Sequence, residues 1–304
     1  MRLRCVAGAA LVTLVLCAAV GAAPEAAGKV RVAVSIQPMK YFVERVGGSA
    51  VQVDALVAPG QNPHTYEATP RQVVSAATAQ AYFKIRWPFE DTLLDKIRGM
   101  NAKMKVYDAT TGITFRELTE DEEEGDEHAG HGHAKHDHAK GEPDPHVWLN
   151  PRMAKTMAAR IAEGLKEIDP ARAAEYDRNL KAFHADLDAL DAKLAAALAP
   201  LKGREFMVYH PAFGYFGDAY GLKQRPIELS GKDPSARQLA EFIKHARERG
   251  VKVIFVQPQF PSRTAETIAQ SIDGVVVFMD DLAYDYLKNL EDMAAKLTQA
   301  LQKK

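Results

Sequence analysis

Short runs of β-forming residues alternate with helical patterns on both sides of one long helical stretch, and this alternation restricts the chain to an α/β fold. Strands that alternate with helices predict parallel sheets covered by helices. In the first half we expect strands at 30–36, 51–57, 81–85 and 105–107 and helices at 39–46, 70–79, 89–98 and 153–168. In the second half we expect strands at 206–209, 223–226, 253–256 and 275–279 and helices at 211–220, 235–249, 263–271 and 284–302. Two α/β lobes are therefore predicted.

The long helical stretch covers residues 169–200 and separates a first lobe at 29–168 from a second lobe at 203–304. Asp169 followed by proline is a helix start signal, and Pro200 followed shortly by glycine is a stop signal. A helix of about thirty residues extends roughly 45 Å, which is long enough to bridge two lobes. We expect one rigid helix to join the lobes. A ligand site should lie in the cleft between them, because ligands of open α/β sheets bind beyond the carboxyl ends of the strands.

The N-terminal segment, residues 1–23, has the layout of a secretory signal peptide. Arg2 and Arg4 give it a positive start, residues 6–20 are apolar, and small residues lead to a cleavage site near 22–23. An uncleaved membrane anchor is the alternative, but a span needs about 18 strongly apolar residues. The segment is therefore predicted to be removed after directing the protein to the periplasm.

Both cysteines, Cys5 and Cys17, lie inside this segment. Acylation of Cys17 as a lipoprotein is a minor alternative, because Leu16 stands where such sites usually carry glycine or alanine. A protein cleaved after this segment has no cysteine, so neither a disulfide nor a thiolate ligand is available. Any metal site must then be built from imidazole and carboxylate groups.

The charge balance argues against nucleic acid as the main partner. The formal net charge is −1, with 39 Lys and Arg against 40 Asp and Glu. Proteins that neutralise phosphates need a basic excess, which this sequence lacks. Apolar residues at 47% and charged residues at 26% are instead typical of a soluble globular protein.

Residues 117–143 stand apart because they are dense in Glu, Asp, Gly and His and show no apolar periodicity. Such a segment cannot bury a core and is expected to be a disordered loop. Imidazole suits zinc, copper and nickel, so clustered histidines among acids predict a weak metal-collecting loop. An acidic solubilising linker is the alternative. The histidines of the loop are His128, His131, His133, His136 and His138.

Three further histidines follow predicted strands or lie beside prolines. His64 comes after the second predicted strand, His146 lies at the stem of the acidic loop, and His210 follows the first strand of the second half. A single histidine of this kind is more often packed or hydrogen-bonded than a ligand, and we assign His184 and His245 to such structural roles. The other three come from both halves and face one cleft, so together they predict a metal site.

Three imidazoles leave a divalent ion short of the four ligands that zinc prefers. Asp280 follows the last predicted strand and is the expected fourth ligand. Asp281 is its close competitor, and a water molecule is a third candidate. Either aspartate alone would more often be a helix cap.

Four segments around these residues resemble the metal-binding solute receptors of ATP-driven zinc and manganese importers, and the zinc receptors most closely. They are Pro-His-x-Tyr-Glu at 63–67, Asp-Pro-His-Val-Trp-Leu-Asn-Pro at 144–151, His-x-Ala-Phe-x-Tyr-Phe at 210–216 and Phe-Met-Asp-Asp-Leu at 278–282. The resemblance covers nearly the whole chain after the signal peptide. It implies two lobes on one long helix, and His64, His146 and His210 as zinc ligands. It also implies Asp280 or water in the fourth position.

The resemblance implies a function and a partner as well. Receptors of this family capture a metal ion in the periplasm and deliver it to the membrane permease of an ABC-type importer, which works with a cytoplasmic ATPase. We therefore expect a periplasmic high-affinity Zn²⁺ receptor that is a monomer and not an enzyme. The histidine-rich loop would bind extra ions weakly.

Three positions depart from the family pattern. Pro63 replaces an acidic residue that precedes the first histidine in some zinc receptors, Gln257 replaces a common glutamate, and Asp281 stands where proline is common. Asp280, Asp281 and water therefore stay alternatives for the fourth ligand. A manganese-preferring receptor of the same family stays an alternative function.

A secreted zinc hydrolase is the alternative from another class, because three histidines and an open position can activate water. However, no His-Glu-x-x-His motif occurs in the sequence. The best general base, Glu67, lies three residues from His64 in a proline-flanked loop. A free-standing metal buffer or adhesin with the same fold is a further alternative.

Overall fold

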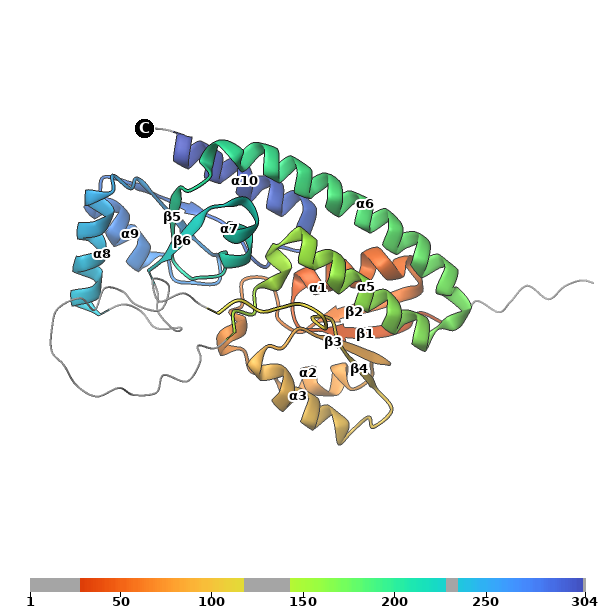
Figure 1. The fold of residues 1–304 in the computed structure, drawn as a ribbon. Coiled ribbons are helices and arrows are strands. Elements are labelled where there is room, and N and C mark those ends of the chain that lie inside the picture. Colours follow the sequence, from red (N-terminus) through yellow and green to blue (C-terminus); the bar gives the residue numbers. More distant parts are fainter. Residues whose placement is uncertain (1–27, 118–142, 228–234, 303–304) are drawn as a thin grey trace, which may run out of the picture.

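The structure is a computed structural model that describes residues 28–117, 143–227 and 235–302 (Figure 1). Its strands are β1 Val30–Val34, β2 Val51–Ala55, β3 Ala81–Lys84, β4 Lys105–Asp108, β5 Glu205–Val208, β6 Lys223–Pro226, β7 Val253–Val256 and β8 Val275–Phe278. They form two four-stranded parallel sheets, ordered β2-β1-β3-β4 and β6-β5-β7-β8. One parallel sheet in each half confirms the predicted α/β class.

Two of the predictions concern residues outside the described ranges. The signal peptide at 1–23 lies there, and so do the loop histidines His128, His131, His133, His136 and His138. Within the described ranges, no helix has both the length and the apolar character needed to pass through a bilayer.

The first sheet is covered by helices on both faces because its central strand is apolar on both faces. Val32, Ala33 and Val34 of β1 are at most 1% exposed, as expected for a buried parallel strand. The helices of this half are α1 Gln37–Gly47, α2 Pro70–Ala76, α3 Pro88–Arg98 and α5 Pro151–Ile168. All four strands run in one direction, so the segments that follow them gather at one edge of the sheet.

The second sheet is less completely covered. Its helices are α7 Gly214–Tyr220, α8 Ala236–Glu248 and α9 Arg263–Ser271. The edge strand β8 leaves Val275 58% and Phe278 51% exposed. In α8 only Ala246 is buried. This half therefore has a thinner apolar interior than the first.

The long helix α6 Ala173–Leu198 passes along both lobes (Figure 1). Short 3-10 turns at Pro170–Arg172 and Ala199–Leu201 precede and follow it, so the predicted stretch at 169–200 is helical but not α-helical at its ends. It contacts α1 and α5 in the first lobe. Its buried side chains recur at steps of three, four and seven residues and are Tyr176, Phe183, Leu187, Leu190, Leu194 and Leu198.

The C-terminal helix α10 Tyr286–Gln302 runs beside α6 (Figure 1). The Tyr286 hydroxyl donates a hydrogen bond of 2.6 Å to the Trp148 carbonyl in the first half. The Tyr286 ring also stands edge-on to Phe42, with 4.8 Å between ring centroids. The predicted second lobe at 203–304 therefore ends in a helix that packs on the first half.

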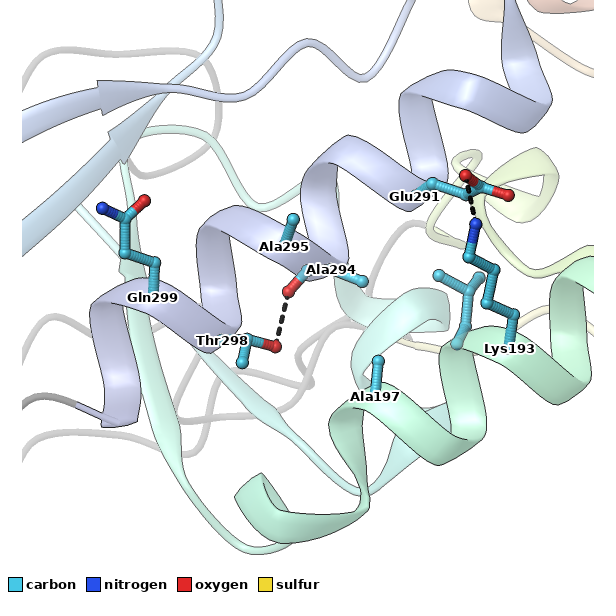
Figure 2. Close-up of a pocket in the computed structure, with 8 residues that line it drawn as sticks. Lys193, Ala197, Glu291, Ala294, Ala295, Thr298 and Gln299 are labelled. Atoms are coloured by element: carbon cyan, nitrogen blue, oxygen red, sulfur yellow. Dashed lines mark hydrogen bonds and ion pairs between the residues drawn. The ribbon is translucent and has the colours of Figure 1, made fainter.

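Figure 2 shows the groove where α6 and α10 lie side by side. Lys193 of α6 and Glu291 of α10 form an ion pair of 2.6 Å at one end. Small side chains, including Ala197 and Ala294, line the groove further along. Small residues let the two helices approach closely, so the groove is a feature of helix packing.

The apolar interior is divided into two clusters. The larger one, here the main core, joins the first lobe, α6, α7 and α10. The smaller one, here the outer core, lies between the second sheet and the helices α8 and α9. Its buried members are Met207, Tyr209, Ile227, Ala246, Ile254, Val256, Ala265, Ile268, Ala269 and Ile272.

Candidate metal centre

His64, His146 and His210 converge between the lobes. Each offers one ring nitrogen, and these three nitrogens all lie within 4.8 Å of one another. The ring centroids of His64 and His210 are 4.5 Å apart, and those of His146 and His210 are 5.2 Å apart. When the His, Cys, Asp and Glu side chains of the described residues are compared, these three histidines form the group whose geometry could hold a metal ion.

His64 is held by a short turn beyond β2. It occupies the middle of a 3-10 turn at Pro63–Thr65, and the proline fixes the backbone at the start of the turn. The Asn62 side chain accepts a hydrogen bond of 2.9 Å from the His64 N–H. The residue remains exposed at its outer side. His64 is thus the ligand candidate nearest to solvent.

His146 is held through its ring by a neighbouring carboxylate. Its Nδ1 lies 2.7 Å from Asp144 Oδ1, and its backbone N–H donates to the same oxygen at 3.0 Å. A neutral ring that donates its Nδ1 proton to Asp144 leaves the Nε2 lone pair free for a metal. His146 Nε2 lies 3.4 Å from His210 Nε2. Both nitrogens therefore face the same point.

Asp144 is buried together with His146, and its side chain is fully covered. Burial alone would raise the pKa of Asp144. Hydrogen bonds from His146 and the charge of Arg116 outweigh burial and hold this pKa below its usual value. Asp144 is therefore an ionised acceptor that fixes the orientation of the His146 ring.

His210 is held through its backbone by an amide side chain. Gln257, which follows β7, donates to the His210 carbonyl at 2.9 Å and accepts from the His210 N–H at 3.3 Å. Phe260 stacks on the His210 ring with 4.8 Å between centroids. Gln257 is one of the departures from the family pattern, and here it serves as a backbone clamp.

Two tryptophans wall the site. Trp87 stands edge-on to His64 at 4.8 Å and to His146 at 5.6 Å between centroids. Trp148 lies 5.2 Å from the His146 ring. We did not predict Trp87 as part of the site, although it follows β3 at the same sheet edge as His64. Its place directly beyond a strand at this edge is the sequence feature that could have indicated a role in the site.

The loop that carries Trp87 is held by the buried carboxylate of Glu90. Glu90 Oε2 accepts hydrogen bonds from the N–H groups of Ile85 at 3.0 Å and Trp87 at 2.9 Å, and Glu90 also bonds to the Ser35 hydroxyl. Arg86, between these two donors, has a left-handed φ of 67°. Such a conformation is costly for a non-glycine residue and persists only where its surroundings hold it.

The enclosure of the site keeps the His64 ring neutral. Although the residue as a whole is exposed, its ring lies against Trp87, His146 and His210, and this partial burial, with smaller effects of the two histidines, lowers the pKa of His64. A metal needs the deprotonated nitrogen of a histidine. The lowered pKa favours the neutral His64 ring, which is the form that can present a ring nitrogen to a cation.

The structure does not bring Asp280 into this cluster. Asp280 Oδ1 accepts hydrogen bonds from the Gln259 side chain at 2.7 Å and from the Leu282 N–H at 2.9 Å. The residue lines a small pocket beside Gln37 and Pro59. Asp280 thus serves as a turn cap, which is the structural role that a single aspartate at this place often has.

Asp281 has the opposite surroundings. It is 4% exposed, and within the described part of the chain its Oδ1 has no hydrogen-bond partner. Burial raises the pKa of Asp281 to about 7, and its attraction to His210 acts against that rise. Trp148 Nε1 donates to the Asp281 carbonyl at 2.8 Å. Asp281 therefore offers a buried carboxyl oxygen without a hydrogen-bond partner among the described residues, although it does not belong to the group of three histidines.

The two remaining histidines lie apart from the cluster. His184 of α6 pairs through Nε2 with the Lys155 carbonyl of α5 at 3.0 Å, so it ties two helices together. His245 lies in the last turn of α8. Neither belongs to the group that could hold a metal, as expected from the sequence.

Comparison with known proteins agrees with this arrangement. The profile of the family described as "ZnuA: Zinc-uptake complex component A periplasmic" matches residues 32–300. The high-affinity zinc uptake system protein ZnuA of Brucella abortus (strain 2308) is 34% identical over 300 residues, which cover 89% of each protein.

Solved structures show the same relation. A crystal structure of ZnuA matches this fold with a TM-score of 0.81 at 39% identity, over 90% of this chain and 99% of that one. A 138–173 deletion mutant of ZnuA with zinc bound matches with a TM-score of 0.79 at 37% identity, over 90% and 98% of the two chains. The chain therefore belongs to the ZnuA family, the periplasmic component A of zinc-uptake complexes.

Proposed function

We propose that this protein is a periplasmic receptor that binds one Zn²⁺ ion between its lobes and delivers it to the membrane permease of an ABC-type importer. The observation that carries the proposal is the convergence of His64, His146 and His210. Zinc binds imidazole nitrogen at about 2.0–2.1 Å, so two ligands of a tetrahedral ion lie about 3.3 Å apart. The Nε2 atoms of His146 and His210 are separated by 3.4 Å.

The chemistry of the cluster supports zinc over manganese as the preferred cargo. Three imidazole nitrogens meet there, and no carboxylate of the described residues belongs to the group. Imidazole suits zinc, whereas manganese prefers carboxylate, carbonyl and water oxygens. If one carboxylate joined the three neutral imidazoles after the ion had bound, the site would still contain mostly nitrogen ligands and would still favour zinc.

We propose Asp281 rather than Asp280 for that carboxylate. Asp281 has a buried oxygen without a partner in the described structure and its carboxylate is attracted by His210, whereas Asp280 already accepts two hydrogen bonds. A buried unpaired carboxyl group is unfavourable unless something pairs with it. A bound cation would meet this need. Water in the fourth position stays the alternative, and the matched aspartate variants below separate the two.

Two observations speak against the zinc hydrolase. Its best general base, Glu67, is exposed and does not belong to the cluster. Membership in a family of zinc-uptake components supports a transport role. An open position on the metal would therefore serve exchange of the ion.

The predicted low-affinity loop is a separate proposal. We propose that residues 117–143 collect zinc weakly and pass it to the histidine cluster. A 138–173 deletion mutant of ZnuA that is similar to this chain has zinc bound. Deleting 121–140 from this protein should leave the tight site intact and lower only the capture rate or the number of ions bound.

Titration of the mature, metal-free protein with Zn²⁺ and Mn²⁺ tests the main proposal. We expect one tight zinc site and much weaker manganese binding, measured by calorimetry with a competing chelator, and a monomer by light scattering. Tight manganese binding with weak zinc binding would reassign the cargo. Absence of any tight site would overturn the proposal.

A further inference from the structure

We infer that Arg116 transmits contact between the lobes to the orientation of His146, so that separation of the lobes speeds zinc release. The inference rests on the proposed zinc-binding function. It concerns a positioning residue, because Arg116 reaches His146 only through Asp144. The observations that carry it are a forked ion pair, two hydrogen bonds across the lobes and a glycine that makes room for the guanidinium.

The Arg116 guanidinium joins one carboxylate from each half of the chain. Its Nη1 lies 3.1 Å from Asp144 Oδ2, and its Nε lies 3.0 Å from Asp218 Oδ2 on α7. The Arg116 side chain is 13% exposed, that of Asp144 is fully covered, and that of Asp218 is 62% exposed. Arg116 therefore connects a surface group of the second half to the carboxylate that orients His146.

The backbone around this fork is tied across the lobes as well. The Tyr215 hydroxyl of α7 accepts a hydrogen bond of 2.9 Å from the Arg116 N–H and donates one of 2.9 Å to the Asp144 carbonyl. The Asp144 N–H donates to the Arg116 carbonyl at 3.0 Å. Movement of α7 would therefore loosen both Arg116 and Asp144.

Gly214 at the start of α7 makes this arrangement possible. A Cβ atom at this position would overlap the Arg116 guanidinium. The overlap is with the far end of a flexible side chain, so a methyl group would push the guanidinium aside while its charge stays in the protein. Gly214→Ala thus perturbs the position of Arg116 without removing it.

The consequence follows from the chemistry of histidine ligands. While the lobes are together, Arg116 holds Asp144, and Asp144 keeps the Nδ1 proton of His146 so that Nε2 points at the ion. Carboxylates that orient metal-bound histidines in this way contribute about 10–100-fold in metal affinity. A permease that shifts α7, which packs in the main core, relative to Arg116 would weaken the site through Asp144 without contacting a ligand itself.

Zinc release to a chelator, followed by stopped flow on the full protein, tests the inference. Asp218→Asn removes only the exposed arm of the fork and should raise the dissociation rate about threefold, as for partly exposed ion pairs. Arg116→Met should raise the rate about tenfold or more. In the Arg116→Met background, Asp218→Asn should add nothing, because the link is already cut.

Asp188→Asn is the matched control. Asp188 is 63% exposed and forms a 2.6 Å ion pair with Lys155 between α5 and α6, far from any carboxylate that orients a ligand. This variant should release zinc at the wild-type rate. Gly214→Ala gives a second route, with an expected increase between those of Asp218→Asn and Arg116→Met.

The outcomes separate this inference from the proposed function. If the wild type lacks a tight zinc site, the proposed function fails and the inference with it. If the wild type binds zinc tightly but Asp218→Asn releases it at the wild-type rate, only the inference fails. Two other results would also reduce Arg116 to a structural role. One is a lower melting temperature of metal-free Asp218→Asn together with a wild-type rate of zinc release. The other is an equal effect of Asp218→Asn on zinc release in the wild-type and Arg116→Met backgrounds.

Discussion

The main core and the outer core support opposite sides of the metal centre, and they differ in how firmly they do so. Trp87 and Trp148, which flank His146, are buried members of the main core. Phe260, which stacks on His210, is only partly buried against the outer core. Regions with fewer buried apolar contacts open at lower free energy. The difference indicates that the His210 side of the site is the easier one to displace.

Strand β5 lies on the boundary between the two cores. Phe206 and Val208 point into the main core, whereas Met207 and Tyr209 point into the outer core. This alternation is the two-residue period of an extended strand. His210 lies two residues beyond the end of β5, so the histidine that the second half contributes is attached to a strand that both cores share.

The largest expected effect tests whether the ion needs both sides. His146→Ala on the main-core side and His210→Ala on the outer-core side should each weaken zinc binding about 100-fold or more, because structural zinc sites gain roughly 3 kcal/mol per ligand. Calorimetry with a competing chelator measures this, and His184→Ala is the control. If only one of the two variants lost zinc affinity, the ligands of the zinc ion would come from one side of the centre alone.

Cavities in the two cores should sharpen the comparison. Leu187 and Ile268 are both fully buried, one in each core. Removing either side chain to alanine costs about 3 kcal/mol. We expect Leu187→Ala to lower the unfolding free energy of the whole protein, whereas Ile268→Ala should mainly speed amide exchange in β7, β8, α8 and α9. Hydrogen exchange with mass spectrometry measures both effects. An equal increase of amide exchange along the whole chain in the Ile268→Ala variant would contradict the division into two cores.

Glu90 gives the main-core side a pH dependence. Burial, partly offset by hydrogen bonds from Ser35 and the Ile85 backbone, raises the pKa of Glu90 from 4.5 to about 7. The folded protein holds this proton more tightly than the unfolded chain, so the stabilisation is complete below pH 4.5 and is lost as pH rises through 7. The unfolding free energy of the wild type should fall by about 2 kcal/mol over this window relative to Glu90→Gln. Denaturant melts across that range measure it, and parallel profiles would contradict the assignment.

The smallest expected effect separates two adjacent residues in the turn after β8, between Met279 and Leu282 of the main core. Asp281→Asn should weaken zinc binding about tenfold, because the amide keeps an oxygen but loses the charge that a ligating carboxylate supplies, whereas water in the fourth position predicts a change within about twofold. Asp280→Asn should leave zinc affinity within about twofold and reduce stability instead, since its carboxylate caps a turn. The reverse result would restore Asp280 as the fourth ligand.

Much of the fold could be predicted because apolar periodicity reports burial directly. The strands of the second half begin and end within one residue of their predicted bounds, and the stretch at 169–200 is helical throughout. The convergence could be predicted in part because His64 and His210 lie beyond the carboxyl ends of strands in the two sheets, where ligands of α/β sheets bind, whereas His146 follows no strand of the described residues and was predicted from its place at the stem of the acidic loop. These features depend on short stretches of sequence.

The rest depends on contacts between distant segments, which short stretches do not report. Successive side chains of an extended segment point in opposite directions. Whether Asp280 or Asp281 faces the ligands is therefore set by the turn after β8, which Gln259 and Trp148 hold from elsewhere in the chain. The fork at Arg116 escaped prediction for the same reason, since its carboxylates are 28 and 102 residues away.

The packing of α10 on α6 has a consequence for dissecting the protein. The face of α6 that α10 covers, together with the Phe42 ring that Tyr286 contacts, would be bare in a fragment that stopped before 286. Such a fragment should collect into soluble aggregates or be degraded during expression, even though it retains all three histidines. The seventeen residues of α10 thus cover part of the hydrophobic interior, and a tag or fusion at the C-terminal end should leave the packing of α10 on α6 undisturbed.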